Sequence, residues 1–166
     1  MAVTSSEAIL TLPTDEQILV TREFDAPKHL VYKAWTTPEL VERWWHAKRG
    51  QVTVVEIDLR VGGKWRYVMV ADDGYEVGFH GEYREIVPDE RIVSTEIFEG
   101  LPEGVSEQDA ATVNTVSFTE ANGRTTLTLL IEARNKTSRD AIIESGMEAG
   151  LQDALDLLEQ TANSLR

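Results

Sequence analysis

The chain has 166 residues, a length typical of one domain, and 29 acidic against 16 basic residues give it a net charge of −13. This charge repels phosphate backbones and anionic lipid surfaces, so we expect neither a nucleic-acid partner nor a membrane partner. The sequence has no cysteine, which excludes disulfides, zinc–thiolate sites and thiol nucleophiles. It shows no secretory signal and no apolar run of the ~20 residues that span a bilayer, which predicts a cytoplasmic location.

The first residues differ in composition from the rest of the chain. Residues 1–14 are rich in Ser and Thr, and we expect them to form a flexible N-terminal arm. A single domain is predicted over residues 15–166. Apolar residues alternate from Ile18 to Phe24, which predicts its first strand.

Two short helices are expected next. Pro27 predicts the start of the first, capped by Asp25 or Ala26, and Pro38 predicts the start of the second, because proline at the first helical position loses no hydrogen bond. Three of the four tryptophans then fall between positions 35 and 45, ending in Trp44-Trp45. Such dense aromatic rings favour either a lid over an apolar interior or the closing of one end of a core, and both interpretations stay open.

The middle of the chain is typical of an antiparallel sheet. Apolar residues recur at every second position and predict strands over residues 52–59, 64–70, 77–87, 91–98, 113–119 and 125–133. Turn residues separate the strands, and the strongest signal is Asn122-Gly123, a typical two-residue hairpin turn. Residues 99–112 are predicted to form a longer acidic loop.

The last predicted element is an amphipathic helix over residues 138–165, capped by Thr137 or Ser138. Gly146 and Gly150 border its apolar stripe, although glycine costs ~1 kcal/mol relative to alanine inside a helix. They indicate that space is needed beside the sheet, either for close backbone approach or for a ligand. The elements predict an α+β fold in which a bent antiparallel sheet and one long helix enclose a cavity.

Several segments occur together in the order and spacing of a known family. They are Phe24-Asp25-Ala26-Pro27, the stretch from Ala34 to Trp45, the stretch from Asp58 to Arg66 with its Gly62-Gly63 turn, the stretch from Gly81 to Val93, and Gly146-Met147-Glu148-Ala149-Gly150-Leu151. Over roughly residues 18–158 the chain resembles the START-like (SRPBCC, helix-grip) superfamily, in the branch named for homology to the activator of the heat-shock chaperone ATPase.

The resemblance implies a helix-grip fold: a curved antiparallel sheet wrapped around a long C-terminal helix, with two short helices after the first strand. It also implies a deep cavity between sheet and helix. The superfamily includes lipid and polyketide binders and aromatic cyclases, so the fold alone does not fix the function. Leu151 stands where such sequences often carry tryptophan; the smaller side chain either enlarges the pocket or replaces a core residue without effect.

Strand alternation places aromatic residues and a methionine together on one face of two neighbouring strands. Such rows are typical of a core as well as of a ligand site. The predicted ligand-binding residues are Trp45, Trp65, Tyr67, Met69, Phe79, Tyr83, Met147 and Leu151. We predict non-catalytic binding of a small hydrophobic or aromatic molecule, without a catalytic residue, a metal or a cofactor.

Two other functions stay open. A cyclase- or hydrolase-like enzyme would use His46 or His80 in the cavity, with a tyrosine or an acid, for proton transfer. The third histidine, His29, is expected to be exposed, and the three lack the spacing of a metal site. A protein-binding, co-chaperone-like regulator would need a basic partner, and its first candidate surface is the acidic loop over residues 99–109. Asp58 and Arg60 are expected to form a structural pair at a hairpin.

Overall fold

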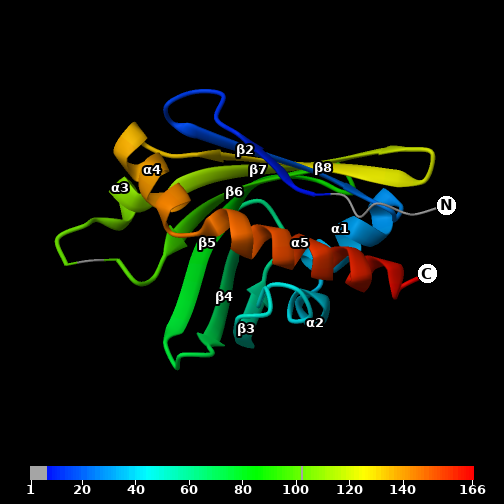
Figure 1. Cartoon of the computed structure of the whole chain (residues 1–166), viewed down its shortest axis with the longest axis horizontal. Helices are drawn as coiled ribbons and strands as arrows, with labels where there is room; N and C mark the ends of the chain where they lie inside the picture. Colours follow the sequence, from blue (N-terminus) through cyan, green and yellow to red (C-terminus); the bar gives the residue numbers. More distant parts are fainter. Residues whose placement is uncertain (1–6, 102) are drawn as a thin grey trace.

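The computed structural model describes residues 7–101 and 103–166, and an antiparallel sheet with a long helix across one face dominates it (Figure 1). The eight strands follow one another in the order β1-β2-β8-β7-β6-β5-β4-β3. Their bounds are β1 Ile9–Thr11, β2 Gln17–Phe24, β3 Gly50–Ile57, β4 Lys64–Ala71, β5 Glu76–Val87, β6 Arg91–Phe98, β7 Thr112–Ala121 and β8 Arg124–Glu132. The predicted strands are confirmed to within a few residues.

Short strand β1 was not predicted. It pairs with β2 inside the stretch for which the sequence predicts a flexible arm. Ala8, just before it, is held by the side chain of Gln152: its N–H donates to Gln152 Oε1 at 3.0 Å, and Gln152 Nε2 donates to its carbonyl at 2.7 Å. Residues 1–6 of the predicted arm, like residue 102 of the predicted acidic loop, lie outside the described residues.

The tight turns have the backbone that their residues favour. Asn122 and Gly123 both have positive φ, 55° and 75°, which is the type I′ geometry that matches the twist of the β7–β8 hairpin. Ala121 pairs with Arg124 on either side of this turn. Local sequence alone therefore sets the register of the longest hairpin ladder on this side of the sheet.

The helices are α1 Lys28–Thr36, α2 Pro38–Val41, α3 Glu107–Ala110, α4 Lys136–Glu144 and α5 Met147–Asn163. Helix α2 begins at Pro38, as predicted, and its N-cap is Thr37. The N-cap of α1 is Pro27 itself, with extended backbone, so the predicted caps Asp25 and Ala26 are wrong. The predicted acidic loop contains the single turn α3.

The C-terminal segment is broken, where the sequence predicted one continuous helix. Gly146 has φ 86°, a left-handed conformation that ends α4 and allows α5 to start in a new direction. Asn135 caps α4 by accepting a hydrogen bond from the Ser138 N–H at 2.8 Å, so the predicted caps Thr137 and Ser138 are wrong. Gly150 does lie inside α5, but a Cβ there would meet no atom within 4 Å. Close backbone approach is therefore not the reason for this glycine.

The core lies where α1 and α5 cover β2, β7 and β8. Its strand residues are those that alternate onto the inner face of the sheet, and its helix residues come from the apolar stripes of α1 and α5. Among its most buried members are Ile18, Val20, Phe24, Val31, Val116, Phe118, Leu127, Leu155 and Leu158. On β4 to β6 the core continues with Trp65, Tyr83 and Ile92, whereas Tyr67 and Phe79 are only partly buried against it.

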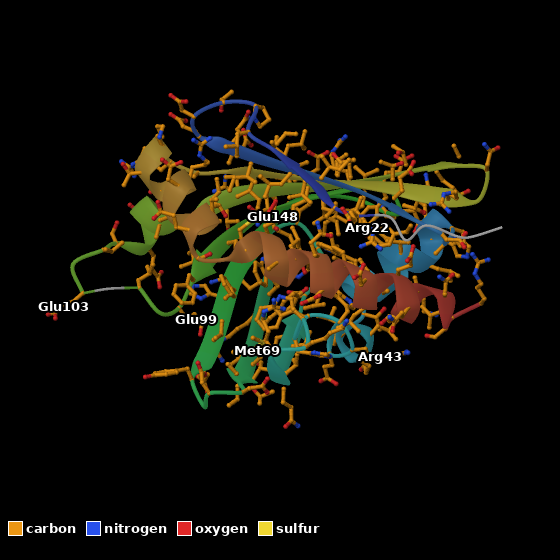
Figure 2. The ribbon with its side chains drawn as sticks, in the orientation of Figure 1. Arg22, Arg43, Met69, Glu99, Glu103 and Glu148 are labelled. Atoms are coloured by element: carbon orange, nitrogen blue, oxygen red, sulfur yellow. The ribbon has the colours of Figure 1, made fainter. Side chains whose placement is uncertain are left out.

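Arg22 is the largest polar side chain in this core and is only 1% exposed. It points from β2 toward α5, where Nη1 lies 2.8 Å from Asp156 Oδ1 and Nη2 lies 3.4 Å from Glu159 Oε1. Its guanidinium also lies 5.1 Å from the centre of the Phe24 ring. These contacts join the C-terminal half of α5 to β2 and so fix the position of the helix over the sheet (Figure 2).

Candidate functional site

The inner face of the sheet continues past the core onto β3, β4, β5 and β6. Tyr67 of β4 pairs with Val55 of β3 on one side and with Phe79 of β5 on the other, so these side chains share that face. All three are partly exposed, whereas Leu127 of β8 on the same face is fully buried. Figure 1 shows β3, β4 and β5 extending away from α5 on the side opposite β2. On this part of the inner face Val55, Tyr67 and Phe79 are therefore less buried than the residues under α1 and α5, although Trp65 and Tyr83 beside them are buried.

Aromatic rings concentrate on this part of the inner face. Trp45, from the segment after α2, meets Tyr67 edge to face at 5.5 Å and Phe79 at 5.9 Å between ring centres. Trp65 lies 4.9 Å from Tyr67, and Phe98 lies 5.2 Å from Phe79. We call these five residues the aromatic cluster. Such offset and edge-on pairs hold one another in place and leave apolar ring surface toward the interior.

The two adjacent tryptophans have different roles. Trp44 is buried, stacks on Trp35 at 5.0 Å, and donates its indole N–H to the Ala34 carbonyl at 2.9 Å. Trp45 stays partly exposed in the aromatic cluster. Trp44 therefore closes one end of the core, whereas Trp45 packs on Tyr67 and Phe79. That Trp45 acts as a lid stays a prediction.

The other predicted site residues surround the aromatic cluster. Tyr83 is buried on the inner face of β5, and Met69 lies on the inner face of β4 toward the β4–β5 turn. Met147 and Leu151 of α5 are partly buried and pack against the core. Figure 2 shows Met69 and Arg22 on opposite sides of α5 in this view. That these residues bind a ligand stays a prediction.

A polar group that sequence reasoning missed lies on the same inner face. Glu96 of β6 pairs with Thr112 of β7, next to Asn114. The Thr112 hydroxyl donates to Asn114 Oδ1 at 2.9 Å, and Asn114 Nδ2 donates to Glu96 Oε2. Burial raises the pKa of the Glu96 carboxyl, and the hydrogen bond from Asn114 opposes this shift. Alternation from Ile92 would have placed Glu96 on this face.

Two tyrosines of this face have raised pKa values. Burial raises the pKa of Tyr67 well above its ordinary value, and electrostatic interactions with Tyr83 and with Glu96 add to the shift. Burial is also the largest cause of the raised pKa of Tyr83, followed by electrostatic interactions with Tyr32 and with Asp58. Both hydroxyls therefore keep their protons throughout the physiological range and can act as hydrogen-bond donors.

The histidines do not gather around the inner face. His80 pairs with Arg66 on the outer face of the sheet, and its Nδ1 lies 2.9 Å from Glu99 Oε2. His46 accepts the Lys48 N–H at 3.0 Å within its own turn. His29 is exposed, as predicted. The enzyme hypothesis therefore loses His80, which does not lie on the inner face. In the part of the chain that the structure describes, no group of His, Asp and Glu able to hold a metal ion occurs.

Charged residues outside the inner face make structural contacts. Arg60 Nε lies 2.8 Å from Asp58 Oδ2, which confirms the predicted hairpin pair. Glu99, at the start of the acidic loop, receives two hydrogen bonds from Arg66 at 2.9 Å. The hydrogen bond from Arg66 is the main reason why the pKa of Glu99 is lowered, and the hydrogen bond with His80 lowers it further, against the effect of burial.

Of the described helices, none has the length and apolar character to cross a membrane.

Comparison with known proteins identifies the family and supports the fold described above. The family model for Activator of Hsp90 ATPase homolog 1-like proteins matches residues 25–163. No curated protein matches the sequence.

Solved structures share the fold. A crystal structure of a protein from Rhodobacter sphaeroides has 22% identity and a TM-score of 0.84, covering 95% of this chain and 99% of that one. A protein from Chromobacterium violaceum has 28% identity and a TM-score of 0.72, with 87% and 95% covered. The AHSA1-like protein from Aeromonas hydrophila has 20% identity and a TM-score of 0.63, with 89% and 93% covered. These likenesses support the curved sheet and C-terminal helix as a shared architecture.

Proposed function

Because the chain belongs to the family of Activator of Hsp90 ATPase homolog 1-like proteins, a branch with the START-like fold, we propose that it binds a small hydrophobic or aromatic molecule without catalysis. The ligand would lie between α5 and the inner face of β3 to β6. The observation that supports this proposal is the aromatic cluster, whose rings Trp45, Tyr67 and Phe79 stay partly exposed on the inner face. Rings left accessible on an inner face offer apolar contact area that a ligand can cover.

Gly81 supports a rigid wall for this site. A Cβ at position 81 would overlap the Thr95 carbonyl and come within 2.7 Å of Trp65 Nε1. The indole N–H of Trp65 donates to that same carbonyl at 3.2 Å. The absence of a side chain at Gly81 therefore lets the Trp65 ring lie close against β5 in one orientation. A wall that is already ordered before binding loses less conformational entropy when the ligand arrives.

Gly150 supports room on the helical side. It lies in the first turn of α5, next to Leu151, and a Cβ there would meet no atom within 4 Å. Glycine is unfavourable inside a helix by about 1 kcal/mol relative to alanine. With close packing excluded, the open space at Gly150 is compatible with the other reason that the sequence offered, room for a ligand.

The proposal is tested by titrating the protein with N-phenyl-1-naphthylamine, a neutral dye whose fluorescence rises in apolar sites. We expect saturable binding. Trp45→Ala and Phe79→Ala should each weaken it about tenfold, because one aromatic contact contributes roughly 0.5–1.5 kcal/mol beyond the area it buries. Tyr75→Ala is the matched control, since Tyr75 is 72% exposed at the β4–β5 turn.

A second measurement separates loss of binding from loss of folding. Thermal unfolding of each variant without dye shows whether the fold is retained, and saturating dye should raise the unfolding midpoint of the natural protein. The proposal fails if the dye does not saturate, or if Trp45→Ala and Tyr75→Ala bind it equally well.

A further inference from the structure

Glu96 has one carboxyl oxygen that the protein leaves unused. Oε2 accepts the hydrogen bond from Asn114, whereas Oε1 receives none from the described residues. No Lys, Arg or His of the described chain forms an ion pair with this carboxyl, in contrast to Glu99 with Arg66 and His80 on the outer face. A partly buried carboxyl group on the inner face is thus present without a counter-ion.

Glu96 is partly exposed, and its unused oxygen is not among the fully buried side-chain atoms that lack a hydrogen bond. Among the described residues, the hydroxyl of Tyr32 is the one fully buried side-chain oxygen or nitrogen without a hydrogen bond. Glu96 Oε1 lacks a partner but is not sealed in this way, and the same holds for the hydroxyls of Tyr67 and Tyr83. Glu96 of β6 and Tyr67 of β4 are therefore partly exposed polar residues on the inner face, with the buried Tyr83 on the strand between them.

The neighbours of Glu96 orient it as an acceptor. The Thr112 hydroxyl donates to Asn114 Oδ1, which turns the Asn114 amide N–H toward the carboxyl. Thr112 is buried, so this relay is held inside the protein. An N–H donor facing one oxygen favours the ionised carboxylate, which has only acceptors to offer. Burial acts in the opposite direction, which leaves the carboxylate in need of a positive partner.

A cationic group of a ligand would supply the positive partner that the Glu96 carboxylate lacks. A buried charge is unfavourable unless it is paired and hydrogen-bonded. The rings of Trp65 and Tyr67 lie on the same face, and aromatic ring faces attract ammonium groups. The net charge of −13 also attracts cations and repels anions at long range.

We propose that the ligand is an organic amine whose apolar body packs on the aromatic cluster and whose ammonium group donates a hydrogen bond to Glu96 Oε1. The inference rests on the proposed function, since it assigns a chemical class to the molecule bound at the same site. An alcohol of the same shape could accept from Tyr67 and donate to Glu96, but it would not compensate the negative charge. A carboxylic acid of the same shape would be repelled.

The test uses three probes with one apolar body: 1-naphthylmethylamine, 1-naphthalenemethanol and 1-naphthaleneacetate. Isothermal titration calorimetry at pH 7.5 should give the order amine, alcohol, acid, with the amine at least about tenfold tighter than the alcohol, as expected for a charge-assisted hydrogen bond. Glu96→Gln keeps the shape of the side chain and should abolish this preference. Glu148→Gln, an exposed position on α5, changes the net charge equally and should retain it (Figure 2).

A pH series on the natural protein avoids dependence on the variant. Amine affinity should fall as the pH is lowered and Glu96 becomes protonated, while alcohol affinity stays constant. Tyr67, whose pKa responds to Glu96, and Tyr83 on the strand between them keep their protons over that range.

The outcomes separate this inference from the proposed function. Equal binding of amine and alcohol, unchanged in Glu96→Gln, would overturn the amine assignment and leave hydrophobic binding standing. Tightest binding of the acid would have the same consequence. If none of the three probes saturates, both proposals fail together.

Discussion

Arg22 offers a direct test of how α5 is held over the sheet. Arg22→Met preserves an unbranched side chain of similar length but removes the guanidinium that contacts Asp156 and Glu159. Breaking a buried ion pair from one side destabilises a protein by about 3–5 kcal/mol, because the remaining charge is left buried and unpaired. Here the carboxylate side chains keep 43% and 22% of their exposure and can be rehydrated. We therefore expect a loss at or just below the lower end of this range, about 2–3 kcal/mol.

The assay is urea unfolding followed by tryptophan fluorescence, with the slope of the transition compared to confirm a two-state process. The triple variant Arg22→Met, Asp156→Asn, Glu159→Gln removes the charges that would be left unpaired, so it should recover part of the lost stability. Raising the salt concentration should change the effect of Arg22→Met only slightly, because a fully buried guanidinium is poorly screened. A loss below about 0.5 kcal/mol, the range of ordinary surface substitutions, would refute the assigned role of the ion pair.

Three further predictions concern single positions, each checked by unfolding measurements. Gly150→Ala should stabilise the protein by about 0.5–1 kcal/mol, because the position is helical and open. Gly146→Ala should destabilise it by about 1 kcal/mol, because φ is 86° there. Equal effects of the two substitutions would contradict these assignments. Tyr32→Phe should be neutral or stabilising by up to about 1 kcal/mol, since the buried hydroxyl has no hydrogen-bond partner; a marked loss would show that the hydroxyl is paired. The lowered pKa of Glu99 means that its ionised form stabilises the folded state above the ordinary carboxyl value of 4.5, and that this stabilisation disappears as the pH falls through the lowered pKa. The stability difference between natural protein and Glu99→Gln should shrink in that acidic range, and a constant difference would disagree with the Arg66 contact.

The sequence by itself determined the strands, helix starts and turns that depend on residues adjacent in the chain. Alternation of apolar residues located the strands from β2 to β8, because side chains on a strand point to opposite faces. Pro38 marked the start of α2, and Asn122-Gly123 marked the β7–β8 turn, because each depends on the backbone angles of one or two residues. The resemblance to the family then supplied how these elements are arranged, and the comparisons confirm it.

Tertiary structure decided which residues share an environment. The apolar spacing of residues 138–165 was compatible with one helix, but packing against the sheet required the change of direction that Gly146 allows. The sequence could not distinguish Trp44 from Trp45, because the difference depends on Trp35 and on the rings of β4 and β5. The sequence could not predict the hydrogen bond of Glu96, because its partner Asn114 lies on the neighbouring strand β7. Pattern reveals the face on which a side chain lies, whereas the pKa, the exposure and the unused hydrogen-bonding capacity of that side chain are set by residues distant in the chain.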